Sequence, residues 1–366
     1  MTTTHEAALD METLRHPGQL LDIADEWNRL ASTSGSPFLT VEWLSAWWSA
    51  FGKGAFTCLL LRDSSGSLRA GVCCRVAGRR LRAAANVHSG DWDVVASDDG
   101  ARGLGWQAVA GLGAGFLDLP AIRRAASLGQ ACRALSGIGY SVATVPGPQS
   151  PYLELPATWE QLSESVSRNL RSQLGRRRRA LERAGRLRLR TTSGGEALEH
   201  DLEAFLRLES SGWKARSETA ILSDPRTARL YRHFATSAAA AGWLRLHLLE
   251  LDGVPIAGDL DCAFAGGTFL IKTGFDERYA EFSPGLVLRG AVLRAAIEEG
   301  SGFYDFLGGP DGYKLRWTTV VRPRSTVKGY RGPWRPLVAY QAAIRPPLRA
   351  GVRRARAFRA GLARRP

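Results

Sequence analysis

One segment in the second half of the chain pairs a lysine with a predicted strand-to-helix junction. A strand is predicted over 268–274 and carries Lys272, and a helix to Glu299 is predicted to begin at Ser283-Pro284-Gly285-Leu286. Serine is a good N-cap, proline suits the first helical position, and the first N–H groups of a helix can bind an anion. We expect this junction to hold phosphate, although a capped helix with no ligand explains the pattern equally well.

A second segment follows the next predicted strand. The run from Tyr304 to Lys314 places Asp305 within a strand predicted over 303–307 and Tyr313-Lys314 at the end of the glycine-rich loop that follows. A lysine beside a tyrosine can stabilise a developing oxyanion or protonate a leaving group. Asp305 is a candidate acid–base group, with pairing to an arginine as the structural alternative.

Two carboxylates are predicted to share one face of a strand. Asp259 and Asp261 lie two residues apart, and side chains alternate across a sheet. Together they could orient an amine nucleophile, or one of them could act as a base. Exposure of both to solvent is the alternative.

Two further groups are weaker candidates for substrate binding. Trp213-Lys214 lies at a predicted helix end and could line a cleft, although packing with snorkelling explains it as well. His88, Asp91 and Asp93 share a polar loop whose spacing matches no known zinc pattern, so we predict no metal site. The chain has no GxSxG, P-loop, GxGxxG or HExxH motif, which disfavours serine hydrolases, P-loop NTPases, Rossmann enzymes and zincins.

The net charge of +14 has a local origin. Residues 312–366 contain 15 basic and no acidic residues, which leaves the rest of the chain close to neutral. A second cluster over 168–190 holds ten arginines, among them Arg176 and Arg179. Such patches attract phosphate, nucleic acid or anionic lipid, and a solvated basic face is the alternative. We expect at most a weak contact of the basic C-terminal tail, residues 336–366, with an anionic membrane, because Pro346-Pro347 interrupts its apolar residues.

The five cysteines form no CxxC pair, and their odd number argues against a disulfide framework. The first residues lack the apolar core of a signal peptide, and no apolar run is long enough to cross a membrane. We therefore expect a cytoplasmic protein, at most peripheral to the inner face of the membrane.

The predicted elements indicate an α/β chain with mixed sheets. Helices are predicted over 20–50 and 158–184, and two glycine turns join three strands between 244 and 274 into an antiparallel meander. The clearest linker is the proline-rich run 146–151. We predict an N-terminal half over 1–150, a C-terminal half over 151–335 and a basic tail over 336–366.

Several short motifs of the second half occur in a characteristic order. They are Glu209 with Gly-Trp-Lys214, Gly253-Val-Pro-Ile-Ala257, Lys272-Thr-Gly-Phe-Asp-Glu-Arg-Tyr279, Phe282-Ser-Pro-Gly-Leu286, and Asp305-Phe-Leu-Gly-Gly309 with Tyr313-Lys314 and Trp317. This ordered set resembles the GNAT-superfamily acyltransferases of the CelD/BioF2-like group. The resemblance covers about residues 155–330 well, and Pro37-Phe38 with Glu42-Trp43 extends it into the first half.

The resemblance implies a tandem GNAT-like acyltransferase fold with two similar halves, as in the Fem-type peptidyltransferases that use aminoacyl-tRNA. Tyr313-Lys314 stands where the aromatic-Lys pair of those enzymes follows the late strand. The turn Glu281-Phe-Ser-Pro-Gly-Leu286 departs from the Q/R-x-x-G-x-G/A turn that holds CoA in ordinary GNAT enzymes.

The resemblance implies that an acyl group, commonly acetyl, passes from acyl-CoA as cosubstrate to an amine or hydroxyl of a small molecule or cell-envelope precursor. No tightly bound cofactor and no DNA partner are expected. In this reading Lys314, Tyr313, Asp305 and Asp259 are catalytic. Lys272 and Ser283–Leu286 hold the donor with Arg176 and Arg179 outside them, and Trp213, Lys214, His88, Asp91 and Asp93 face the acceptor. An aminoacyl-tRNA-dependent ligase and a non-catalytic accessory protein of polysaccharide biosynthesis remain alternatives.

Overall fold

The computed structural model describes residues 9–123, 125–211 and 220–339, and the chain divides into two compact units. The first unit takes in residues 1–19, 53–147 and 324–366, and the second takes in 20–52 and 148–323. The predicted boundary at residue 150 lies close to one of the crossings. The predicted halves differ from the units because residues 20–52 belong with the second unit and residues from 324 onward belong with the first. The tail from 340 onward lies outside the described residues.

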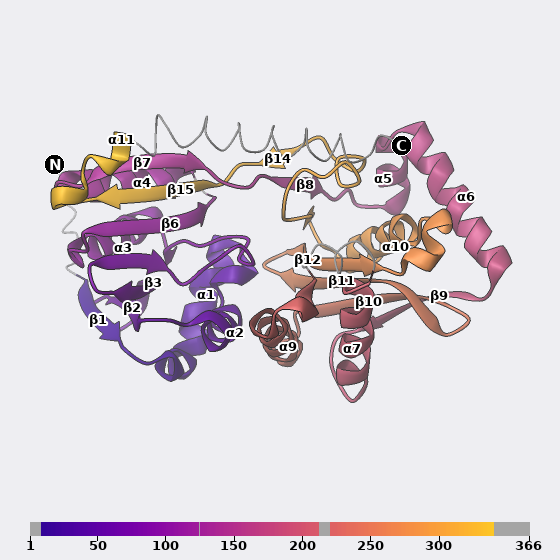
Figure 1. Cartoon of the computed structure of the whole chain (residues 1–366), viewed down its shortest axis with the longest axis horizontal. Coiled ribbons are helices and arrows are strands. Elements are labelled where there is room, and N and C mark those ends of the chain that lie inside the picture. Colours follow the sequence, from indigo (N-terminus) through magenta and orange to yellow (C-terminus); the bar gives the residue numbers. More distant parts are fainter. Residues whose placement is uncertain (1–8, 124, 212–219, 340–366) are drawn as a thin grey trace, which may run out of the picture. The chain divides into compact units, whose positions relative to one another are not determined.

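The first unit is built on an eight-stranded sheet, with strand order β1-β2-β3-β4-β6-β15-β7 and with β5 paired to β3 (Figure 1). Its elements are β1 (Asp10–Leu14), β2 (Ala55–Arg62), β3 (Leu68–Ala77), β4 (Arg80–Ala83), β5 (Val95–Ala96), α3 (Asp99–Gly111), β6 (Phe116–Ile122), α4 (Ala125–Gly137), β7 (Ser141–Pro146), β15 (Ser325–Tyr330), η5 (Gly332–Trp334) and α11 (Leu337–Ala339). The strand β4 runs parallel to β6, whereas β15 lies antiparallel between β6 and β7.

Helices α3 and α4 cover one face of this sheet. Leu81, Leu117 and Val327, from β4, β6 and β15, are fully buried in one cluster with Trp106 of α3 and Leu135 of α4. Side chains alternate along a strand, so the even-numbered residues of these three strands project from the opposite face.

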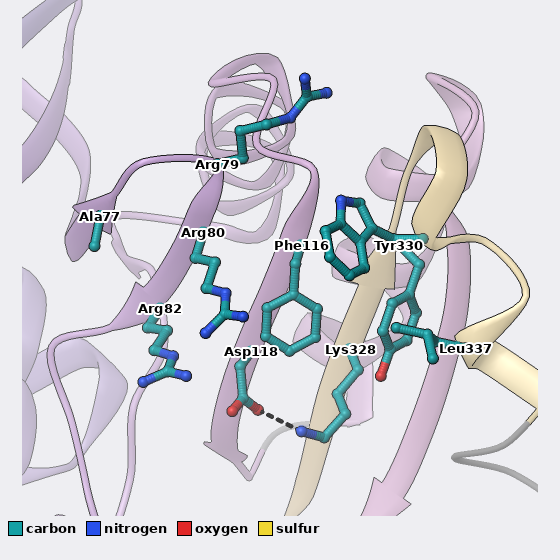
Figure 2. Close-up of a pocket in the computed structure, with 10 residues that line it drawn as sticks. Ala77, Arg79, Arg80, Arg82, Phe116, Asp118, Lys328, Tyr330 and Leu337 are labelled. Atoms are coloured by element: carbon teal, nitrogen blue, oxygen red, sulfur yellow. Dashed lines mark hydrogen bonds and ion pairs between the residues drawn. The ribbon is translucent and has the colours of Figure 1, made fainter.

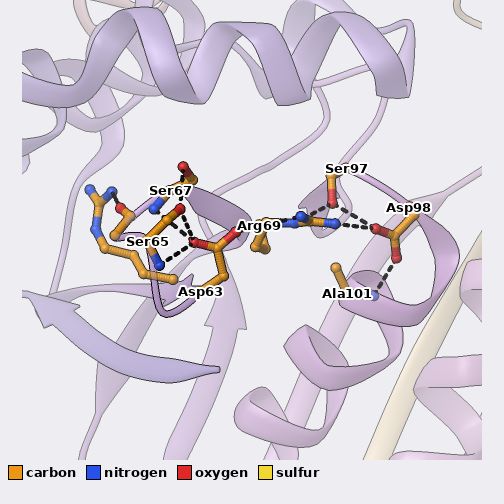
Figure 3. A network of polar contacts seen from close by, with 9 residues as sticks. Asp63, Ser65, Ser67, Arg69, Ser97, Asp98 and Ala101 are labelled. Carbon is orange, nitrogen blue, oxygen red and sulfur yellow. Dashed lines mark hydrogen bonds and ion pairs between the residues drawn. The ribbon is translucent and has the colours of Figure 1, made fainter. Parts of the chain in front are cut away.

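A polar network ties the β2–β3 turn of the first unit to the start of α3 (Figure 3). Asp98 is the N-cap of α3 and accepts a hydrogen bond of 2.8 Å from the Ala101 N–H. Arg69 bridges Asp98 and Asp63 at 2.9 and 3.5 Å. The backbone N–H of Ala101, together with Ser97 and Arg69, lowers the pKa of Asp98 to about 2, so this cap stays ionised.

The second unit carries a seven-stranded sheet of order β14-β8-β13-β12-β11-β10-β9. Its elements are α1 (Ala24–Ser34), η2 (Pro37–Leu39), α2 (Val41–Phe51), β8 (Ser150–Glu154), α5 (Trp159–Ser165), α6 (Arg168–Ala184), β9 (Leu187–Thr192), α7 (Ala197–Glu209), η3 (Ile221–Ser223), α9 (Pro225–Ala240), β10 (Leu244–Leu251), β11 (Val254–Phe264), β12 (Gly267–Phe275), η4 (Glu277–Phe282), α10 (Pro284–Glu298), β13 (Phe303–Asp305) and β14 (Val321–Arg322). The short helix η1 (Pro17–Ile23) spans the first crossing between the units.

The antiparallel meander over β10, β11 and β12 is as predicted. After β12 the chain passes through α10 and returns as β13, which is parallel to β12. The two strands pair only where Gly267–Phe269 faces Phe303–Asp305. Beyond that point β12 continues to Phe275 with no β13 partner, so the sheet opens between two parallel strands.

Helices cover both faces of this sheet. Ala257 of β11 is buried in one cluster with Val292 of α10, so the odd-numbered side chains of this stretch face α10. The neighbouring Gly258 faces α7, because a Cβ there would lie 2.9 Å from the ring of Phe205. Gly274 of β12 also faces α7, where a Cβ would lie 2.6 Å from the Glu209 Cα. Only glycine allows the end of α7 to approach β12 this closely.

Two helix predictions were too long. The segment 20–50 contains α1 and α2, which are separated by η2 at Pro37. The segment 158–184 contains α5 and α6, because the backbone is extended at Val166 and Ser167 caps a new helix through the Leu170 N–H. In both segments the spacing of apolar residues continues from one helix into the next, so the sequence pattern does not reveal where the first helix ends.

Candidate active site

A cavity of about 600 Å³ lies in the second unit where β12 and β13 separate. Its walls come from residues 270–275 of β12, residues 306–308 after β13, the start of α10 at 283–286 and the end of α7 at 208–209. Tyr313, Lys314 and Trp317 of the following loop also line the cavity. The two segments singled out in the sequence therefore border one cavity.

The start of α10 forms one wall, with an unusual cap. Ser283 has a left-handed backbone, at φ +51°, and its side chain makes no capping hydrogen bond, so the prediction of a serine N-cap was wrong in detail. Pro284 does occupy the first helical turn. Gly285 leaves room there, since a Cβ would meet only Phe275, at 3.8 Å. The opening of the helix, which carries partial positive charge, therefore borders the cavity.

Lys314 is buried, and its ammonium group is fully occupied. The Nζ atom lies 2.9 Å from the Leu307 carbonyl oxygen, 3.2 Å from the Gly309 carbonyl oxygen and 2.9 Å from the Asp311 carboxylate. An ammonium group has three donors, and these three acceptors account for them all. Burial lowers the pKa of Lys314, and Asp311 opposes that shift. In this conformation Lys314 holds the loop that carries Tyr313, whose ring lies 5.5 Å from Nζ and is 45% exposed.

Asp305 supports the same loop from the other side. Its carboxylate accepts hydrogen bonds from the Ser150 hydroxyl and, at 2.9 Å, from the Leu307 N–H. Leu307 has a left-handed backbone, at φ +49°, which is costly for a residue with a branched side chain. Asp305 is fully buried and is absent from the described lining of the cavity, so the structure places it behind the loop.

A buried arginine that the sequence reasoning missed reaches the cavity. Arg289 of α10 lines it, is 3% exposed, and pairs with Asp259 at 2.9 Å between Nη2 and Oδ2. Arg289 also contacts the hydroxyl of Tyr304, which donates to Asp261 at 2.6 Å. Asp259 and Asp261 do share a face, but both are fully buried beneath α10. Asp259 therefore lies behind Arg289 and does not border the described cavity.

The charges of this cluster do not balance if both carboxyl groups ionise. Burial, together with the charge of Asp259, raises the pKa of Asp261 well above its ordinary value. Asp261 therefore takes up a proton at a higher pH than an ordinary aspartate does. A signal for Arg289 was present in the sequence: it is a charged residue within the apolar run Leu286 to Ala296, opposite two predicted carboxylates.

Lys272 and Glu209 meet the cavity from the α7 side of the sheet. Within the described ranges, the Lys272 ammonium has no hydrogen bond or ion pair, and it lies 5.1 Å from the centre of the Tyr231 ring. Burial lowers its pKa, and the charge of Glu209 acts in the opposite direction. Glu209 is 1% exposed and accepts a hydrogen bond of 2.7 Å from the Ile221 N–H. Glu209 belongs to a motif in which the predicted substrate-binding residues are Trp213 and Lys214, and these two lie outside the described residues.

The remaining predicted site residues lie elsewhere. Arg176 and Arg179 are exposed on α6 and are absent from the described lining, whereas their neighbour Arg177 donates to the Glu281 carbonyl oxygen at 2.5 Å. The two side chains lie on a solvent-facing part of α6, so the structure does not bring them to the cavity.

The predicted acceptor loop has structural contacts inside the first unit. Asp91 is 3% exposed and pairs with Arg324 at 2.7 Å. Asp93 is 8% exposed and accepts from the Ser127 hydroxyl and the Val94 N–H. His88 is half-buried in the same loop. No group of three or more histidine, cysteine or acidic residues suited to a metal ion occurs among the described residues. In the same part of the chain, no helix is both long and apolar enough to cross a membrane.

Comparison with known proteins identifies the class of this site. Residues 168–315 match the family model for the acetyltransferase (GNAT) domain, and this span contains the cavity except for Arg316 and Trp317. No curated protein matches the chain. Residues 168–315 of the second unit thus match a GNAT acetyltransferase domain, in agreement with the predicted superfamily.

Solved structures show the fold of the whole chain. The structure of FemX matches with a TM-score of 0.60 at 12% identity, over 91% of this chain and 99% of FemX. A conserved protein of unknown function from Bacteroides thetaiotaomicron matches with a TM-score of 0.56 at 11% identity, over 88% of this chain and all of that one. The C-terminal domain of a putative lysylphosphatidylglycerol synthetase from Agrobacterium fabrum matches with a TM-score of 0.54 at 13% identity, over 85% of this chain and 92% of that domain. At these identities the likeness establishes the fold, which is shared with FemX as expected.

Proposed function

We propose that this protein is an acyltransferase that binds an acyl-CoA in the cavity between β12 and β13 and transfers the acyl group to an amine or hydroxyl. The single observation that carries the proposal is the opening of the sheet between two parallel strands beside the start of α10. The cavity of about 600 Å³ suits a small-molecule ligand, and the GNAT domain match supports the reaction class. The acceptor is a small molecule or an envelope precursor.

The donor is held by positive charge at two places. The opening turn of α10, Ser283–Leu286, offers backbone N–H groups to the phosphates. Lys272 offers an ammonium group with no hydrogen bond to a described residue. We assign the carbonyl of the acyl group to the neighbourhood of Lys272, where a nearby positive charge stabilises the oxyanion of the tetrahedral intermediate.

The proton of the acceptor goes to Glu209. This carboxylate lines the cavity, acts electrostatically on Lys272, and is shielded from bulk water. It takes the proton as the acceptor's nitrogen or oxygen attacks the acyl carbon, and collapse of the intermediate releases the CoA thiolate. Tyr313, which is partly exposed at the cavity, donates the proton to that leaving group. Lys314 and Asp305 hold the loop that positions Tyr313.

A charge change at Ser283 tests donor binding. Ser283→Asp adds a negative charge beside the proposed phosphate site, whereas Ser283→Asn adds a side chain of similar size without charge. Because asparagine and aspartate both tolerate left-handed backbone, neither change should disturb the helix start. We expect Ser283→Asp to weaken acetyl-CoA binding at least tenfold in calorimetry and Ser283→Asn to change it less than threefold. Equal affinities in the two variants would remove the donor site from this helix.

Glu209→Gln tests the base. The amide oxygen can still accept from the Ile221 N–H, so the fold should persist. We expect turnover to fall by about 10²-fold or more while acetyl-CoA affinity stays unchanged. A variant with wild-type turnover would exclude this role.

An aminoacyl-tRNA-dependent amide ligase is the second candidate, and the fold shared with FemX favours it. Its donor would also be anionic, but binding would span a much larger basic surface and would weaken steeply with salt. Tight binding of charged tRNA with no thermal shift from any CoA thioester would favour this candidate over the first.

A further inference from the structure

A second cavity, of about 580 Å³, is lined by residues of the first unit (Figure 2). Its floor is the sheet face opposite α3 and α4, formed by side chains of β4, β6 and β15 in register. Arg80 pairs with Phe116, which pairs with Tyr330, and Arg82 pairs with Asp118, which pairs with Lys328. Two rows of three side chains thus cross three neighbouring strands.

Positive charge collects here without being neutralised. Lys328 lies 3.0 Å from Asp118, so this pair accounts for the one carboxylate of the lining. The side chains of Arg79, Arg80 and Arg82 make no hydrogen bond or ion pair with any residue in the described part of the chain. The Nε of Arg82 is buried and unsatisfied. A buried guanidinium nitrogen without an acceptor is costly, and an anionic ligand would supply one.

The same cavity presents flat apolar surfaces. Phe116 and Tyr330 pack with ring centres 5.3 Å apart, and Trp334 of η5 adjoins them with 43% of its surface exposed. Arg79 and Trp334 lie side by side, because a Cβ at Gly115 would be 3.3 Å from the Arg79 Nε and 3.4 Å from the indole ring. Exposed indole and guanidinium planes are surfaces on which a planar ring can stack.

We propose that this basic and aromatic cavity binds a nucleoside diphosphate or a molecule that carries one. Three arginines without partners match the charge of two linked phosphates, which is about three negative charges at neutral pH. The exposed Trp334 provides a face for the base. The volume of about 580 Å³ suits a nucleotide-sized ligand. This site lies in the first unit and does not depend on the acyltransferase proposal.

Charge variants test the phosphate part of the site. ADP and inorganic tripolyphosphate are titrated into the full-length protein and into Arg80→Gln/Arg82→Gln. The matched control is Arg133→Gln, an exposed arginine of α4 outside the cavity lining. We expect Arg80→Gln/Arg82→Gln to lower the affinity for both ligands at least tenfold. Arg133→Gln should change these affinities less than twofold. Arg79→Gln/Arg80→Gln, both exposed, repeats the test should the half-buried Arg82 be needed for folding.

Trp334→Ala tests the ring. We expect this variant to bind ADP at least fivefold more weakly and to bind tripolyphosphate with unchanged affinity. Because ADP resembles part of CoA, each variant is also titrated with acetyl-CoA, whose affinity should not change in Arg80→Gln/Arg82→Gln. The proposal is overturned if wild-type protein binds neither probe, if Ser283→Asp and not the arginine variant abolishes ADP binding, or if a single-stranded RNA 12-mer binds more tightly than ADP.

Discussion

The ammonium group of Lys314 donates a hydrogen bond of 2.9 Å to the carbonyl oxygen of Leu307, a residue held in the left-handed region at φ +49°. Asp305 accepts from the N–H of the same residue at 2.9 Å. The strained backbone of Leu307 is therefore fixed on both sides by buried charged groups. This arrangement sets the course of the chain as it leaves β13 and enters the cavity wall.

Lys314→Met should unfold more easily than the wild type. The change keeps most of the apolar stem but leaves the Leu307 and Gly309 carbonyl groups without their donor. Hydrogen bonds to a charged group contribute about 1.5–3 kcal/mol, so we expect the free energy of unfolding to fall by about 2–3 kcal/mol. Urea denaturation measures the change. Turnover should fall together with stability, and Lys314→Arg should recover part of both. An unchanged unfolding midpoint would show that the three contacts do not hold the loop.

Lys272→Met, unlike Lys314→Met, should lose activity without losing stability. The Lys272 ammonium is largely buried, and its described contact is the Tyr231 ring at 5.1 Å. Replacing a desolvated ammonium by an isosteric apolar side chain costs little or stabilises the fold. We expect the unfolding midpoint to stay the same or rise, while turnover drops by about 10²-fold because the oxyanion loses its positive partner. Full turnover in Lys272→Met would assign that role to another group.

Breaking the Arg289–Asp259 pair should be costly, and removing both charges should be much less so. Arg289→Met leaves Asp259 buried without its counter-charge, which typically costs about 3–5 kcal/mol. Asp259→Asn/Arg289→Met removes both charges, so we expect the double variant to be more stable than Arg289→Met alone. Chemical denaturation of the two variants and the wild type gives the comparison. A double variant no more stable than Arg289→Met would indicate that the pair is not coupled in this way.

Much of the site could be predicted from sequence because its residues lie close to glycines and prolines that mark element boundaries. Lys272, Ser283–Leu286 and Tyr313-Lys314 all border the one cavity, and each belongs to a short local pattern. What the patterns could not show is which groups are already satisfied. Lys314 and Lys272 look alike in sequence, but only the folded loop supplies Lys314 with three acceptors.

Long-range contacts account for the rest of the differences. Asp305 turned away from the cavity because it bonds to Ser150, which is 155 residues distant. Asp91 is neutralised by Arg324, which is 233 residues distant. The role of Arg289 in α10 was not predicted because it depends on Asp259 of β11 and Tyr304 of β13. No local spacing encodes these partners. The division into units could not be predicted either, because α2 packs against α9, a helix formed much later in the chain.

Acid should destabilise the second unit through His247. This histidine of β10 lies opposite Asp259 in the register of β11, and its Nδ1 is 2.9 Å from the Thr191 hydroxyl. Burial, followed by the charges of Arg289 and Arg245, lowers its pKa to about 3. The folded protein therefore keeps His247 neutral, whereas the unfolded chain takes up a proton near its ordinary pKa of about 6.5. The stability that depends on neutral His247 is complete above pH 6.5 and declines as the pH falls toward 3.

The size of the effect follows from the same linkage. One proton corresponds to about 1.36 kcal/mol per pH unit, so lowering the pH from 7 to 5 should cost the wild type about 2 kcal/mol through His247 alone. His247→Gln has no such proton, and its loss of stability between these pH values should be smaller by about that amount. Urea unfolding of both proteins at pH 7 and pH 5 measures the difference, and the carboxyl groups that titrate in both proteins cancel. Parallel losses in the two proteins would mean that His247 is protonated in the folded state or is not shielded from water.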